Sequence, residues 1–107
     1  MLLATTEDLG GLRIERVLGL VEGNVVHSKH LGRDLMAGFK GLVGGEIRGY
    51  TEMLAEARQQ ARQRMVEVAT QRGADAVVGG RYATSSIREG MSELLCYGTA
   101  VKLARGD

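Results

Sequence analysis

The 107-residue sequence is short of several residue types that often shape a small protein. It has no proline, so it lacks the usual signature of a rigid linker, and we expect one domain over residues 1–107. Its one cysteine, Cys96, cannot form a disulfide within the chain. Tryptophan is absent and aromatic residues make up only 4%, which leaves few side chains on which bases or sugars could stack.

Charge of one sign and long apolar runs are also scarce. The 14 Lys and Arg residues nearly balance the 13 Asp and Glu residues, and a net charge of +1 provides no basic surface for a nucleic acid. No apolar run approaches the roughly 20 residues that span a bilayer, and the first residues lack the basic and apolar regions of a signal peptide. We therefore expect a cytoplasmic protein without nucleic-acid or membrane partners.

Glycine is abundant, with 16 residues, and five of them fall within one irregular segment. This segment runs from Val26 to Glu46, and its glycines separate short apolar pieces. Because glycine adopts backbone conformations that other residues resist, we expect a loop here, with one or two short helical turns. Gly19 and Gly23 lie earlier, inside an apolar stretch, where they predict a bulge or a bend.

Tyr50 to Arg72 carries the clearest periodic pattern in the chain. Apolar residues recur at helical spacing, and most charged residues fall between them. The apolar positions are Tyr50, Met53, Leu54, Ala57, Ala61, Met65, Val68 and Ala69. Gly73 follows at the position where a left-handed C-cap is expected. The pattern predicts one long amphipathic helix, and the small residues Ala57 and Ala61 would let it lie close to a sheet.

The remaining apolar segments predict strands. Leu12 to Val25, Ala76 to Thr84 and Met91 to Leu103 have the alternation of strands, with a polar turn at Ser85 to Gly90. A short extra strand could form at Leu2 to Thr5. The sequence thus predicts an α+β fold in which a small sheet of three to four strands packs on one helix, in the order strand, loop, helix, strand, strand.

Both faces of the long strands carry apolar residues. In the first strand Leu12, Ile14, Leu18 and Leu20 are expected on one face, and Val17, Val21 and Val25 on the other. In the last strand Leu94, Cys96 and Ala100 oppose Leu95, Tyr97, Val101 and Leu103. One helix covers only one face of a sheet. We therefore expect the second apolar face to be buried by self-association.

His27, His30 and Cys96 are the candidate metal ligands. The two histidines lie three residues apart, which brings them together on a helical turn but sends them to opposite faces of a strand. Cys96 suits a soft metal if Met91 or a histidine lies beside it, or if symmetry repeats it. The alternatives are exposed histidines in a polar loop and a cysteine that packs as a small apolar residue.

A glycine-rich anion site and a catalytic site are the two other kinds of site to consider. The glycine-rich run from Gly38 to Gly45, together with Lys40 and Arg48, could present backbone N–H groups and charge to an anion near a helix N-terminus. It matches no nucleotide-binding motif. The carboxylates and serines show no spacing that pairs them with a nucleophile or a base, so we do not expect an enzyme.

The sequence also resembles a known family. The stretch VGGEIRGYTEMLAEARQQARQRMVEVATQRGADAVVG, the later GTAV at Gly98 to Val101 and the earlier RIERVLGLVEGNVV resemble the YbjQ-like family of small bacterial and archaeal proteins, described as heavy-metal-binding. The resemblance covers nearly the whole chain. It implies an α+β subunit that assembles as a homo-oligomeric ring, most simply a homopentamer. It transfers no metal ligand to a numbered position, since its motifs are glycines and small apolar residues.

Together these observations predict a ring-forming binding protein, with a transition or heavy metal as the ligand class that the resemblance suggests. Two alternatives remain open at this point. The ring could hold a small anionic metabolite at its subunit interfaces, or it could serve as a scaffold without a small ligand.

Overall fold

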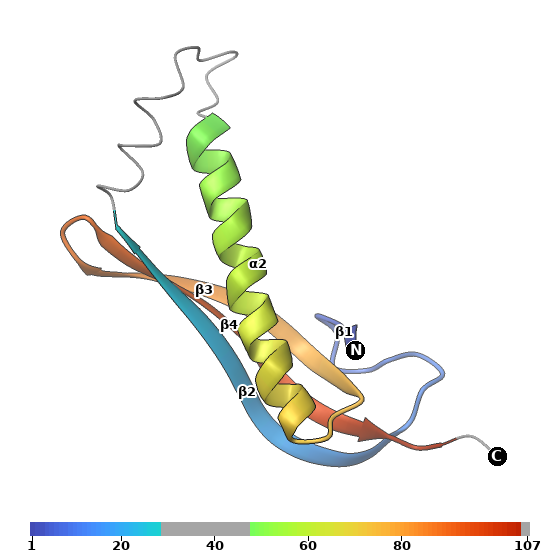
Figure 1. The fold of residues 1–107 in the computed structure, drawn as a ribbon. Helices are drawn as coiled ribbons and strands as arrows, with labels where there is room; N and C mark the ends of the chain where they lie inside the picture. Colours follow the sequence, from blue (N-terminus) through green and yellow to red (C-terminus); the bar gives the residue numbers. More distant parts are fainter. Residues whose placement is uncertain (29–47, 106–107) are drawn as a thin grey trace.

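The computed structural model describes residues 1–28 and 48–105, apart from the side chain of Arg48. Its elements are β1 (Leu2–Leu3), β2 (Ile14–Ser28), α2 (Arg48–Gln71), β3 (Ala76–Arg88) and β4 (Met91–Leu103). The four strands form one sheet in the order β1-β3-β4-β2, and α2 lies across one face of it (Figure 1). The α+β fold and the predicted order of helix and strands are confirmed.

The sheet is mixed, and β4 lies at its centre. β4 pairs antiparallel with both β2 and β3, whereas the two-residue β1 pairs parallel with the start of β3. The expected extra strand at Leu2 to Thr5 is therefore present in a shorter form. Among the described residues, no helix has both the length and the apolar character needed to cross a membrane.

Two strands are longer than predicted. β2 continues to Ser28, so Val26 belongs to a strand and not to the predicted loop, whose residues 29–46 lie outside the described part of the chain. β3 continues to Arg88, and the predicted polar turn shrinks to Glu89 and Gly90. Polar residues remain in β3 because β4 pairs with it along this length. Backbone pairing outweighs side-chain composition here.

The C-terminus of α2 has the predicted glycine cap. Gly73 has a φ of 75°, and its N–H donates to the carbonyl of Thr70 at 2.9 Å. The N–H of Ala74 donates to the carbonyl of Ala69 at 3.0 Å. These two bonds form a Schellman motif, which satisfies carbonyls that the end of a helix leaves without partners.

A β-bulge at Gly19 changes which side chains of β2 face the helix. Gly19 has a φ of 107°, and the register with β4 shifts between Val17 and Gly19. As a result Leu18 packs with Val21 in the core under α2, whereas Val17 lies opposite Val101 on the other face. The predicted grouping of Leu18 with Leu20 was wrong, because the bulge inserts one extra residue into the alternation.

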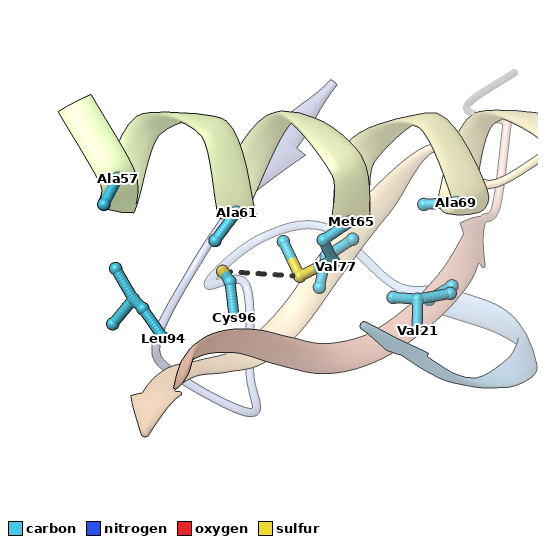
Figure 2. Packing of buried hydrophobic residues seen from close by; sticks show 9 residues of the cluster. Val21, Ala57, Ala61, Met65, Ala69, Val77, Leu94 and Cys96 are labelled. Atoms are coloured by element: carbon cyan, nitrogen blue, oxygen red, sulfur yellow. Dashed lines mark hydrogen bonds between the residues drawn. The ribbon is translucent and has the colours of Figure 1, made fainter. Parts of the chain in front are cut away.

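The main core lies between α2 and the sheet. Ala57, Ala61, Met65 and Ala69, each one helical turn from the next, pack on residues of β2, β3 and β4 (Figure 2). Gly23 lies directly under the helix, where a Cβ atom would collide with the backbone nitrogen of Met65 and the carbonyl oxygen of Ala61. The absence of a side chain at Gly23 therefore sets how closely the helix approaches the sheet.

The face of the sheet away from α2 is only partly covered. A second, smaller cluster forms there from Ala76, Val78 and Val101, with Leu9 and Ile14 packed against it. Beyond this cluster the apolar side chains of β2 are open, with Val17 exposed by 62% and Leu20 by 57%. The two-faced character expected from the sequence is present in the described strands.

Candidate functional site

Cys96 lies in the main core, near the middle of β4. Its side chain is only 4% exposed, and its Sγ donates a hydrogen bond to Met65 Sδ at 3.7 Å (Figure 2). Cys96 pairs across the sheet with Gly23, on which the helical turn that carries Met65 rests. The glycine thus allows the two sulfur atoms to meet.

A cavity of about 230 Å³ borders this sulfur pair. Besides Cys96 and Met65, it is lined by Arg62 from α2 and Tyr82 from β3, and by residues of the N-terminal segment. Arg62 donates a hydrogen bond from Nη1 to the Tyr82 hydroxyl oxygen at 3.3 Å. Arg81 of β3 also lines the cavity, which therefore combines two soft donor atoms with two arginines and a tyrosine.

The environment of Cys96 affects its ionisation in opposite directions. Burial raises the pKa of the thiol, because the low-dielectric interior disfavours the thiolate. The positive charge of Arg62 and a hydrogen bond from Tyr82 both lower the pKa, but burial has the larger effect. The thiol is therefore protonated at neutral pH, and a ligand that needs the thiolate must displace this proton.

His27 lies elsewhere on the same face of the sheet. It pairs with Ser92, four positions along β2 from Gly23, the partner of Cys96. At about 3.4 Å per residue, this places the backbones of His27 and Cys96 roughly 14 Å apart along the strands. Cys96 does not line the cavity that contains His27. The structure therefore does not bring these two predicted ligands into one site within a single chain.

The cavity at His27 has a volume of about 310 Å³ and lies near the start of α2. Its lining includes Tyr50 and Met53 from the helix and Met91 from β4. His27 Nδ1 is buried and has no hydrogen-bond partner among the described residues. An unsatisfied buried polar atom costs about 1 to 3 kcal/mol. Such an atom therefore marks a position where a ligand would be favourable.

The other predicted site residues cannot be placed. His30, Lys40 and the glycine-rich run at 38–45 lie outside the described residues, and Arg48 is described only by its backbone. Within residues 1–28 and 48–105, no group of three or more His, Cys, Asp or Glu side chains could hold a metal ion.

The sequence did not identify Met65 and Met53 as candidate ligands. Met65 belongs to the same helical stripe as Ala57 and Ala61, so its position facing the sheet was predictable. The proximity of Met65 to Cys96 was not predictable, because it depends on the position of the helix along the strands. Met53 was likewise assigned only to the apolar face of the helix.

The fold and the two cavities described above define a small α+β protein with soft donor atoms beneath its helix. The model of the YbjQ family, described as "Putative heavy-metal-binding", matches residues 1–104, and the chain belongs to this family. The resemblance stated from the sequence is confirmed.

Relatives of known sequence cover almost the whole chain. A UPF0145 protein from Vibrio parahaemolyticus is 64% identical over 103 residues, which are 96% of this chain and 98% of that protein. A UPF0145 protein from Thermotoga maritima is 58% identical over 105 residues, or 98% and 99% of the two chains. These names state no molecular function.

A solved structure has the same fold. The crystal structure of a protein with unknown function of the DUF74 family, from Pediococcus pentosaceus, aligns with a TM-score of 0.64. The alignment covers 97% of this chain and 98% of that one, at 18% sequence identity. At this level of identity the likeness concerns the fold alone.

Proposed function

We propose that this chain is a binding protein for a soft heavy-metal ion and that Cys96 and Met65 hold the ion. The observation that carries the proposal is the pair of sulfur atoms, 3.7 Å apart at the edge of a cavity. Metal–sulfur bonds are about 2.3 Å long for zinc, so two sulfurs that share such an ion are at most about 4.6 Å apart. The observed separation lies within this span.

The chemistry of the cavity favours a soft monovalent ion such as Cu(I). Thiolate and thioether sulfur are the ligands that select Cu(I). Because Cu(I) carries one positive charge, its bond to a thiolate is electrically neutral, which suits a buried position. Arg62 assists by favouring loss of the thiol proton. The family description, which names heavy-metal binding, supports the same ligand class.

The test is a titration of reduced, untagged protein with Cu(I) under anaerobic conditions, in competition with a Cu(I) chelator. The ultraviolet charge-transfer absorption of a thiolate–Cu(I) bond reports the Cys96 site. We expect this band to be lost in Cys96→Ser, and the affinity to fall about tenfold, or 1.4 kcal/mol, in Met65→Leu. Met53→Leu, which changes a thioether outside this cavity, should leave the thiolate–Cu(I) band unchanged and serves as the matched control for that band. A Cys96→Ser protein with the wild-type absorption band would refute the proposal.

We further propose that the chain self-associates, as a homopentameric ring, through the open face of the sheet. Val17 and Leu20 are more than half exposed there, and Val26 is exposed by 49%. The free edge of β2 is less suited than this face to contact another chain. Arg64 and Arg72 of α2 donate hydrogen bonds to its carbonyls at Asn24 and Leu20. These bonds occupy groups that another strand would need. The face therefore offers the better contact.

Sedimentation velocity tests this assembly. We expect the wild type to sediment as an oligomer and Leu20→Lys to shift toward the 11.5 kDa monomer, because a charge would be buried without a partner. Leu12→Lys is the matched control, since Leu12 is exposed by 49% but lies outside the strands. A monomeric wild type would contradict the proposal.

A cytoplasmic, non-enzymatic role is part of the same proposal.

A further inference from the structure

We propose that the cavity at His27 is a second, thiol-independent metal site, which binds Ag(I) or Cu(I) through imidazole nitrogen and thioether sulfur. The site lies four positions along the sheet from Cys96, near the start of α2. His27 from β2, Met53 from α2 and Met91 from the start of β4 all line this cavity. In the proposed site the donor atoms are His27 Nδ1 and Met53 Sδ. The inference does not depend on metal binding at Cys96.

His27 Nδ1 is buried, and no hydrogen bond satisfies it among the described residues. A neutral imidazole nitrogen with a free lone pair is a common metal ligand in proteins. An ion bound at this nitrogen would satisfy the atom and remove the cost of leaving it buried without a partner.

The residues that line the His27 cavity supply ligands for a soft ion. Besides His27, the described lining residues supply two thioethers and several hydroxyl groups, but no carboxylate. Hard divalent ions such as Mg²⁺ and Ca²⁺ require several oxygen ligands, with carboxylates among them. Thioether sulfur instead selects soft ions. The described lining residues offer no negative charge to offset a divalent ion, so an ion with a single positive charge is more favourable there.

The residues that line the His27 cavity come from elements far apart in the sequence. His27 and Ser92 are paired across the sheet, and Tyr50 and Met53 come from the first two turns of the helix above them. Elements far apart in the sequence thus converge on one cavity of about 310 Å³, which is large enough for an ion and accompanying water. The Cys96 cavity has a separate lining, so the two sites can be tested independently.

The experiment uses untagged, ¹⁵N-labelled full-length Cys96→Ser protein in chloride-free buffer, titrated with silver nitrate. Native mass spectrometry counts the bound silver, and NMR observes the imidazole nitrogens directly. We expect one silver ion per chain, a shift of the His27 Nδ1 resonance, and a splitting of that resonance by the spin of the silver nucleus. No thiol remains in this protein, so failure of the Cys96 proposal would leave this result unchanged.

Variants assign the ligands. His27→Phe should abolish the binding, and Met53→Leu, which keeps the side-chain volume, should weaken it about tenfold. Met65→Leu is the matched control, because it removes a buried thioether from the other cavity. The proposal is overturned if silver fails to bind, if Met53→Leu binds as tightly as the control, or if the Nδ1 resonance does not respond to silver. A response to inorganic phosphate in place of silver would equally overturn it, since it would identify an anion site.

Discussion

Replacement of Gly23 by alanine should separate the helix from the sheet. The added Cβ would lie 2.8 Å from the backbone carbonyl carbon of Arg64 and still closer to backbone atoms of Met65 and Ala61. Carbon atoms pack best at about 3.5 to 4.0 Å, so α2 must move away by roughly 1 Å. Helix backbone cannot rotate aside as a side chain can. The whole of the main core must therefore adjust.

The expected cost is that of overpacking, about 1 to 3 kcal/mol. For a domain of about 100 residues each kcal/mol lowers Tm by about 4 °C, so we expect Tm to fall by about 4 to 12 °C. The same movement should separate Met65 Sδ from Cys96 Sγ and make the thiol react faster with an alkylating reagent. Thermal unfolding followed by circular dichroism and the rate of thiol alkylation measure the two effects.

The matched control is Gly11→Ala. A Cβ at Gly11 has no heavy atom within 4 Å, and its backbone φ is not in the left-handed region. Alanine there should leave Tm unchanged or raise it slightly, since it restricts the unfolded chain. If Gly23→Ala were as stable as Gly11→Ala, the close approach of α2 to β2 would be refuted.

Three further predictions concern the helix cap and the thiol. Gly73→Ala should cost about 1 to 2 kcal/mol in urea denaturation, because φ is 75° there, and a cost no greater than that of Gly11→Ala would contradict the Schellman cap. Arg62→Gln should raise the pKa of Cys96 further and slow its alkylation at fixed pH, whereas an unchanged rate would show that the guanidinium does not act on the thiol. Because burial raises the pKa of Cys96 in the folded protein, stability should fall as pH rises above the unfolded thiol pKa of about 8.5, until the folded pKa is reached. Urea denaturation below and above that pH measures this loss of stability. In Cys96→Ala the part of the loss that comes from the thiol should be absent, and an equal loss in the wild type and the variant would contradict the assignment.

Much of the fold was predictable because local patterns agree with it. The apolar stripe of α2 and the glycine at its end identify the helix, and the alternation of β4 gives the bounds that the structure has, Met91–Leu103. The bulge at Gly19 was expected in kind. The face of the sheet on which Leu18 lies was not predicted, because a sequence does not state where an extra residue interrupts the pairing.

The candidate sites were less predictable, because they depend on contacts between distant residues. His27 and Cys96 were considered together as ligands, but the pairing of β2 with β4 sets them four positions apart along the sheet. Met65 lies 31 residues before Cys96, and the two meet only because Gly23 admits the helix. No periodicity in the sequence specifies that contact.

X-ray absorption spectroscopy at the copper edge, on His27→Phe protein loaded with a single equivalent of Cu(I), shows directly whether Cys96 and Met65 hold the ion. It counts the sulfur atoms bound to copper. We expect two sulfur ligands, from Cys96 and Met65, in this protein, which lacks the second proposed site, and one fewer when Met65→Leu is added. A sulfur count that Met65→Leu leaves unaltered, or a copper ion bound by nitrogen and oxygen alone, would contradict the proposal.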